Sequence, residues 1–150
     1  MQQTLVLVKP DGVQRRLVGE IISRLERKGL RLAALKLVKA SKELAEKHYA
    51  VHKERPFYGS LVQFITSGPT VAMVWEGREA VAVVRNIVGA TDGTKAPPGT
   101  IRGDYAISVQ NNLIHASDSA ENGAGEIALW FKADEQVGWT AADAAWVTGG

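Results

Sequence analysis

The segment Asn112-Leu-Ile-His-Ala-Ser-Asp-Ser119 contains the residue whose type and position are best suited to chemistry. His115 stands at the end of a short apolar run that opens into a polar stretch. Because the ordinary pKa of histidine is about 6.5, most of its imidazole is neutral at pH 7 and one ring nitrogen keeps a free lone pair. The residue is therefore suited to act as a nucleophile, a base or a metal ligand. The alternative is a core histidine that is hydrogen-bonded to a carbonyl group, which is the commoner case for an isolated histidine.

Two further features favour the chemical interpretation. Glu126 follows His115 by eleven positions, near the start of the last predicted helix, where it could orient the ring through the second nitrogen. Lys9, Arg85 and Arg102 each stand at the end of a predicted element rather than in its middle. One such arginine is usually a solvated charge, whereas three cations close to one histidine would form a phosphate site.

Several common site motifs are absent. The segment 89–95 lacks the spacing of a Walker-type phosphate loop, and neither G-x-G-x-x-G, G-x-S-x-G nor H-E-x-x-H occurs. Any phosphate must therefore be held mainly by side chains. His48 and His52 could share a metal ion, but no third ligand stands near them in the sequence, which favours a helix face with a partly exposed histidine.

The elements that must position these residues alternate between short β-rich runs and helical periods. We expect strands over 5–8, 30–38, 70–75 and 113–116, and helices over 18–28, 42–55, 57–64, 78–88 and 121–131. The segment 89–103 contains four glycines and two prolines and is predicted to be a long, functional loop. Trp139 and Trp146 lie in an Ala-rich tail that is expected to pack against the body or a neighbouring subunit. The pattern indicates an α/β protein.

The composition narrows the classes of protein to consider. A chain of 150 residues is expected to form a single domain, over residues 1–150, with a core of its own. The absence of cysteine excludes disulfides, thiolate catalysis and cysteine-ligated metal sites. A net charge of +2 is too small to indicate a nucleic-acid partner. No apolar run approaches the roughly 18 residues of a membrane span, and we expect a cytoplasmic protein.

The segment 112–119 resembles the active-site signature of the nucleoside diphosphate kinases. Similar matches extend along almost the whole chain: Lys9-Pro-Asp-Gly12, His52-Lys-Glu-Arg-Pro-Phe57, Ser67-Gly-Pro69, Arg85-Asn86, Gly89-Ala-Thr91 and Pro98-Gly-Thr-Ile-Arg-Gly-Asp104. The resemblance implies a single kinase domain with a ferredoxin-like βαββαβ fold of the α+β type, in which helices cover a four-stranded antiparallel sheet.

The resemblance also implies an activity. The family transfers the γ-phosphate of a nucleoside triphosphate, typically ATP, to a nucleoside diphosphate with broad base specificity. The implied mechanism is ping-pong, through a phosphohistidine formed at Nδ1 of His115. A catalytically silent, nucleotide-binding regulatory module on the same fold is the alternative, although every reactive position carries the residue expected of an active enzyme.

Roles for individual residues follow from the resemblance. Glu126 is expected to hold the His115 ring by its Nε2–H, and Ser117 to support that carboxylate. Tyr49 is expected beside the histidine, hydrogen-bonded to Lys9 or to phosphate. The implied nucleotide contacts are Lys9 at the γ-phosphate and ribose, Phe57 on the base, Asn112 on the ribose, Arg85 and Thr91 on the β- and α-side phosphates, and Arg102 near the leaving oxygen.

The resemblance further implies Mg²⁺ as cofactor, with Asp118 as an outer-shell contact, and a homo-oligomer for which a hexamer is favoured over a tetramer. The chain departs from the family in the loop 92–98, where relatives often show Asn-Pro after Gly-Ala-Thr. This loop makes subunit contacts in the family. Gly123 and Gly125 lower helix propensity by roughly 0.8–1 kcal/mol each, so the last helix is expected to begin only near Glu126.

Overall fold

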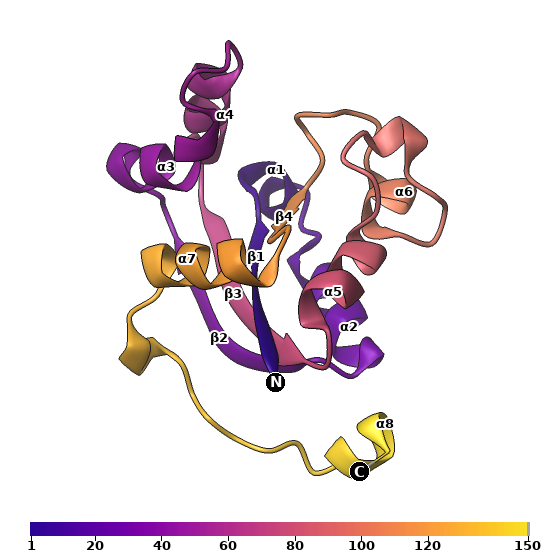
Figure 1. Cartoon of the computed structure of the whole chain (residues 1–150). Helices are drawn as coiled ribbons and strands as arrows, with labels where there is room; N and C mark the ends of the chain where they lie inside the picture. The colour runs from indigo at the N-terminus through magenta and orange to yellow at the C-terminus, as the bar shows by residue number, and fades with distance from the viewer. Residues whose placement is uncertain (150) are drawn as a thin grey trace.

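The computed structural model describes residues 1–149 and contains one four-stranded sheet (Figure 1). Its strands pair antiparallel in the order β2-β3-β1-β4. Their bounds are β1 Gln2–Val8, β2 Arg31–Val38, β3 Thr70–Gly77 and β4 Ile114–Ala116. With α2 between β1 and β2 and α5 between β3 and β4, the order along the chain is βαββαβ. The predicted antiparallel α+β fold is confirmed.

Helices complete the described part of the chain. The α-helices are α1 Pro10–Gln14, α2 Val18–Lys28, α3 Lys42–His48, α4 Tyr58–Ile65, α5 Ala80–Val88, α6 Ile101–Tyr105, α7 Ala120–Trp130 and α8 Ala144–Thr148. Three short 3-10 helices are η1 Ala50–His52, η2 Gly93–Lys95 and η3 Ala133–Glu135. None of these helices is long and apolar enough to cross a membrane.

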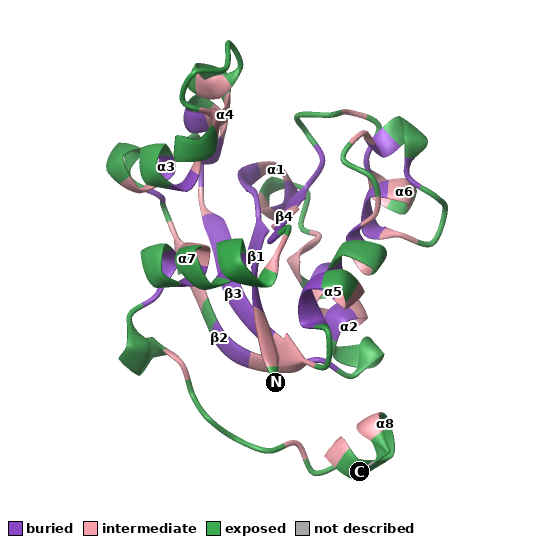
Figure 2. Cartoon of the chain, in the orientation of Figure 1, coloured by how far each residue is buried: buried purple, intermediate pink, exposed green. Residues whose placement is uncertain are grey.

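Strand β1 is buried on both faces, as its continuous apolar run predicts. Val6 and Val8 pack with the apolar sides of α2 and α5, whereas Leu5 and Leu7 pack with those of α3, α4 and α7. The sheet therefore separates two hydrophobic clusters, and Figure 2 shows the buried strands between exposed helix surfaces. This double burial fixes the central strand, at whose end Lys9 stands.

Three predictions about local structure were wrong. The helix expected over 42–55 ends at His48 and is followed by the separate 3-10 helix η1. The segment 89–103 is not a plain loop, because it contains η2 and the start of α6. The Asp92 side chain accepts a hydrogen bond from Thr94 N, and that of Thr100 accepts one from Gly103 N. These N-caps satisfy the first backbone donors of η2 and α6. A composition rich in glycine and proline does not indicate that such short helices form.

Helix α7 begins at Ala120 rather than near Glu126. Ser119 caps it by accepting a hydrogen bond from the backbone N–H of Asn122. Packing favours glycine at position 123, because a Cβ there would lie 3.2 Å from Ser117 Oγ. The cap offsets part of the low helix propensity of glycine, which costs about 1 kcal/mol per residue.

The tail crosses one end of the sheet, and the helices α3 and α4 lie at the opposite end, as Figure 1 shows. Trp139 Nε1 donates to the Leu32 carbonyl at 2.8 Å, and the Arg31 guanidinium lies over the indole ring. This part of the tail packs against the body, which was one of the two predicted partners. The helix α8 that follows was not predicted.

Candidate active site

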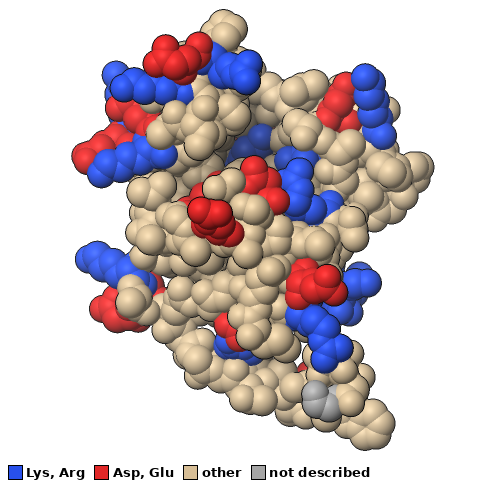
Figure 3. Space-filling model, in the orientation of Figure 1, with Lys and Arg blue, Asp and Glu red and all other residues tan. Residues whose placement is uncertain are grey.

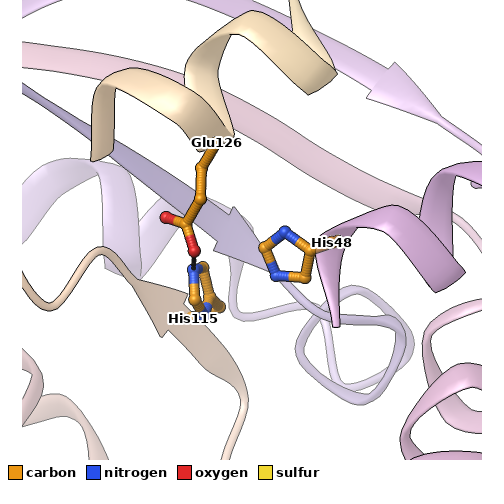
Figure 4. A group of neighbouring side chains, drawn as sticks. All are labelled: His48, His115 and Glu126. Atoms are coloured by element: carbon orange, nitrogen blue, oxygen red, sulfur yellow. Dashed lines mark hydrogen bonds and ion pairs between the residues drawn. The ribbon is translucent and has the colours of Figure 1, made fainter. Parts of the chain in front are cut away.

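His115 lies in β4, opposite Leu7 of the buried strand β1. Its Nε2 is 3.0 Å from Glu126 Oε2 on α7, and Figure 4 shows the carboxylate pointing at the ring. Burial acts to raise the pKa of Glu126, but the hydrogen bonds from His115 and Ser117 outweigh it and the pKa is lowered. An ionised carboxylate only accepts hydrogen bonds, so Nε2 carries the ring proton and Nδ1 keeps the lone pair.

Ser117 couples this carboxylate to the sheet. Its hydroxyl is fully buried and donates to Glu126 Oε1 at 2.8 Å, while it accepts a hydrogen bond from the backbone N–H of Leu5 at 3.0 Å. The three side chains of His115, Glu126 and Ser117 therefore form the expected hydrogen-bonded series. The orientation of the imidazole is set by a strand on one side and a helix on the other.

The backbone just before β4 is strained. Leu113 is fully buried and has φ of +75°, a conformation that costs a residue with a side chain about 1–3 kcal/mol. Two bonds hold it, because Asp11 Oδ2 accepts from Leu113 N at 3.0 Å and Lys9 N donates to Leu113 O at 2.9 Å. A Cβ on Gly12 would lie 2.8 Å from the same carbonyl oxygen, which explains glycine at that position.

Lys9 is one of two buried cations of the site, together with Arg102. Its ammonium donates to Asn112 Oδ1 and to the Gln110 carbonyl at 3.3 Å. Burial lowers the pKa of Lys9 to about 8, against the raising effect of Asp11. The amide of Asn112 donates in turn to the Thr91 carbonyl at 2.9 Å. Three residues predicted to contact nucleotide are thus joined in one network.

The Arg102 side chain is buried and bonded to backbone. Its Nε and Nη1 donate to the carbonyls of Asn112 and Gly89, each at 3.2 Å, and its Nη2 donates to the Ile114 carbonyl at 2.5 Å. Burial, followed by the charge of Arg85, lowers its pKa to about 10, so the group is cationic at neutral pH. Arg85 is exposed on α5 and donates to the Ala116 carbonyl at 3.3 Å.

Tyr49 lies beside the site at the end of α3, but its expected bond to Lys9 is absent. The Lys9 ammonium contacts Asn112 and Gln110 instead, and among the described residues the Tyr49 hydroxyl makes no hydrogen bond. Burial, and then the charge of Glu126, raises the pKa of Tyr49 to about 12. The phenol is therefore a neutral donor, and its contact with phosphate stays a prediction.

The remaining predicted residues lie at the surface. Phe57 precedes α4 with 45% of its surface exposed, and its ring centroid is 5.3 Å from that of His52. Asp118 is exposed after β4 and accepts a hydrogen bond from the Asn122 side chain at 2.7 Å. The space-filling view in Figure 3 is hollowed between the α4 and α6 regions, and lysine and arginine atoms lie inside the hollow.

Residues 2–136 match the family described as "Nucleoside diphosphate kinase". The chain belongs to this family. A nucleoside diphosphate kinase of Picosynechococcus sp. is 58% identical over 147 residues, which cover 98% of this chain and 99% of the relative. Nucleoside diphosphate kinase 3 of Homo sapiens is also 58% identical, over 97% of this chain and 86% of the human protein.

Solved nucleoside diphosphate kinase structures agree with this fold. The Halobacterium salinarum enzyme, solved in complex with CDP, superposes with a TM-score of 0.95 and is 52% identical, with 97% of each chain covered. A family protein from Babesia bovis has a TM-score of 0.96 and 45% identity, over 98% of this chain and 99% of that one. The chain is accordingly a nucleotide kinase that transfers phosphate between nucleotides.

Sequence reasoning about the kinase site missed His48. It is buried, whereas His52 is the partly exposed histidine of this segment, and the group of possible metal ligands that contains His48 is completed by His115 and Glu126 rather than by His52. The His48 ring instead lies between Trp130 and His115, with centroids 5.6 and 4.6 Å away. The helical face that it shares with Leu44 and Ala45 was visible in the sequence, but its partners on α7 and β4 were not.

Proposed function

We propose that the chain transfers the γ-phosphate of a nucleoside triphosphate, typically ATP, to a nucleoside diphosphate through a phosphohistidine at His115, with residues 1–150 acting as one kinase domain. The observation that carries this proposal is the His115 ring, whose Nε2 is tied to an ionised Glu126 while Nδ1 keeps its lone pair. The His115 side chain is 24% exposed, which gives a phosphate access to it.

The bonds that form and break in the chemical step involve only His115 and the nucleotide. The Nδ1 lone pair attacks the γ-phosphorus, a nitrogen–phosphorus bond forms, and the bond from phosphorus to the bridging β,γ-oxygen breaks. That oxygen leaves with the bonding electrons as part of the nucleoside diphosphate. The ring becomes positively charged, and the carboxylate of Glu126 at Nε2 stabilises this charge. A second diphosphate then reverses the step, which predicts ping-pong kinetics.

Cations and amides supply the remaining stabilisation. The transferred group spreads its negative charge over several oxygens, so positioned positive groups supply most of the catalysis. We assign Lys9 to the γ-phosphate and ribose, Arg102 to the leaving oxygen, and the exposed Arg85 to the other phosphates with Thr91. Asn112 is assigned to the ribose, since its amide already lies between the Lys9 ammonium and the Thr91 carbonyl.

Phe57 is assigned to the base. Its ring is half exposed at the entrance to α4, and an aromatic ring stacks on any base because every base has a π-face. Broad base specificity follows from this kind of contact. A stacking side chain of this sort would contribute about 1–3 kcal/mol to binding of each base alike.

Mg²⁺ is the proposed cofactor, and the residues present fit it. This ion prefers oxygen ligands and keeps several waters. Both oxygens of Glu126 are already hydrogen-bonded within the site, whereas Asp118 is an exposed carboxylate after β4. Asp118 would hold the ion through water, with phosphate oxygens as the main ligands. When bound, the ion neutralises charge on the phosphates.

The test compares variants at two of the three histidines of the chain, His115 and His52. Native protein is incubated with γ-labelled ATP, and we expect label on the protein that is labile to acid and stable to alkali. His115→Ala should carry no such label, whereas the matched control His52→Ala should carry the native amount. Unlabelled native protein would favour the silent regulatory module, and equal labelling of His115→Ala would reject His115 as the nucleophile.

We also infer a homo-oligomer, for which we favour a hexamer over a tetramer. β2 is an edge strand of the sheet, and its Leu35 and Leu37 are 50% and 67% exposed. In the tail, Trp146 is 90% exposed. An edge strand with exposed apolar side chains is suited to pair with another chain. Light scattering coupled to size exclusion should give a multiple of the chain mass, and a monomer would contradict the inference.

A further inference from the structure

His48, His115 and Glu126 form a cluster that resembles a metal site. One nitrogen or oxygen atom from each of the three side chains lies within 4.8 Å of the others (Figure 4). Two histidines and one glutamate are the protein ligands of several catalytic zinc sites. A zinc ion in this position would take the His115 lone pair that the proposed reaction needs. Zinc binding at this cluster would therefore block the proposed reaction.

Trp130 determines which nitrogen of His48 can bind a metal. Its indole Nε1 lies 3.1 Å from His48 Nδ1, and both residues are buried. An indole N–H only donates, so Nδ1 of His48 must accept and cannot carry a proton. Burial, followed by the charge of His115, lowers the pKa of His48 to about 3, so the ring is neutral at pH 7. Its single proton is therefore on Nε2.

We propose that Trp130 is a positioning residue that holds His48 in the Nε2–H tautomer and thereby prevents the His48–His115–Glu126 cluster from binding Zn²⁺. A metal bound at Nε2 of His48 would force the ring proton onto Nδ1, where it would point at the indole N–H. A metal bound at Nδ1 would have to displace the indole. In either case a buried donor loses its acceptor, which weakens binding by about tenfold to a hundredfold.

The same tautomer suits the contact between the two histidines. Their ring planes are 79° apart with centroids at 4.6 Å, an edge-to-face arrangement. Such pairs are favourable because a positive ring edge meets a negative face. His48 therefore packs beside the nucleophile as a neutral ring that has no lone pair on Nε2 to compete for the incoming phosphorus. It supports the orientation that the Glu126 bond sets.

The first experiment determines the tautomer in the native protein. With ¹⁵N-labelled histidine, long-range proton–nitrogen spectra distinguish a ring nitrogen that carries hydrogen from one that does not. We expect His48 to show hydrogen on Nε2 only, with its signals assigned from a His48→Gln variant. A proton on Nδ1, or rapid exchange between the two nitrogens, would overturn the proposal without any other variant.

The second experiment measures binding of Zn²⁺ alone to nucleotide-free protein by calorimetry. Trp130→Phe keeps an aromatic ring and removes the N–H, and it should bind Zn²⁺ at least about tenfold more tightly than native protein. Adding His48→Gln should abolish the gain. Trp146→Phe is the matched control: Trp146 is exposed on α8, so this variant should bind Zn²⁺ with the affinity of native protein. Equal affinities of native protein and Trp130→Phe, or a gain that survives His48→Gln, would refute metal exclusion.

Trp130 is a core residue, so circular dichroism must first show that Trp130→Phe is folded. If it is not, the tautomer measurement on the native chain decides the proposal. The benefit for catalysis rests on the proposed role of His115, whereas tautomer and zinc affinity belong to the resting protein. Absence of phosphohistidine formation would thus overturn the proposed function and leave this inference unaffected. A wrong tautomer of His48 or an unchanged zinc affinity would overturn this inference and leave the proposed function unaffected.

Discussion

Replacing Ser117 by alanine removes the hydroxyl that joins Glu126 to the central strand. The buried Leu5 N–H loses its acceptor, and the Glu126 carboxylate loses a donor at 2.8 Å. An unsatisfied buried donor costs about 1–3 kcal/mol and a bond to a charged group contributes about 1.5–3 kcal/mol, so we expect Ser117→Ala to lower the free energy of unfolding by about 2.5–6 kcal/mol at pH 7.

The pH dependence separates the two contributions to this loss. The folded-state pKa of Glu126 lies below its ordinary value of 4.5, so the carboxylate contributes stability above pH 4.5 that is lost as the pH falls through the folded pKa. The part of the Ser117→Ala loss that comes from Glu126 should therefore shrink as the pH falls below 4.5 and through the lowered folded-state pKa. The part that comes from the Leu5 N–H should remain, since no titration affects it.

Urea unfolding at fixed protein concentration measures both quantities, because oligomerisation makes stability depend on concentration. Ser60→Ala is the matched control: Ser60 is exposed and bonds only the Phe57 carbonyl, so its loss should stay below about 0.5 kcal/mol. The reasoning would be refuted if Ser117→Ala were no more destabilising than Ser60→Ala. A loss that does not shrink as the pH is lowered from 7 through the folded-state pKa of Glu126 would refute the assigned role of this carboxylate.

Three further predictions concern the same site. Glu126→Gln removes the carboxylate that keeps the proton on His115 Nε2, and steady-state kinetics should show kcat reduced about 10²–10⁴-fold; a loss below tenfold would count against tautomer control. Since the pKa of Lys9 is about 8, kcat/KM should fall as the pH rises through that value and the ammonium loses its charge. A Lys9→Gln variant should not show this decrease in kcat/KM at high pH. If the variant and the native protein had the same pH profile, Lys9 would be excluded as the group that titrates. Gly125→Ala meets open space and should raise the unfolding free energy by about 0.5–1 kcal/mol, whereas Gly123→Ala crowds Ser117 and should not stabilise. Thermal melts compare the two, and equal stabilisation would contradict the packing argument.

Much of the fold follows from local patterns. The apolar run over 5–8 predicted a doubly buried strand, and Gly29 marked the end of α2, where its φ of +104° requires a residue that tolerates the left-handed region. The antiparallel pairing came from the family resemblance rather than from periodicity. Strand order is set by contacts between distant residues, and a pattern of alternating strands and helices does not specify it.

The site was predictable where a residue type carries its own chemistry. His115 and Glu126 stand out because an imidazole and a carboxylate can form a hydrogen-bonded catalytic pair, although Glu126 lies in the middle of α7 and not near its start as expected. His48 was missed because its function depends on what surrounds it: a histidine on an apolar helix face acquires a defined tautomer only when Trp130, 82 residues away, donates to it. The capped start of α7 was missed for a related reason, since the low propensity of glycine was weighed without the Ser119 cap.

Arg102 ties its own helix to two other segments, each 10–13 residues away in the chain, through the carbonyl of Gly89 and those of Asn112 and Ile114. Exchanging only the stretch from 89 to 103 with that of a relative would replace the guanidinium and one of its acceptors but leave the other two behind. Such a chimera would retain a well-formed 89–103 segment only if the incoming arginine met both remaining oxygens. Recombination between homologues should therefore succeed more often when its crossover points lie outside 89–114.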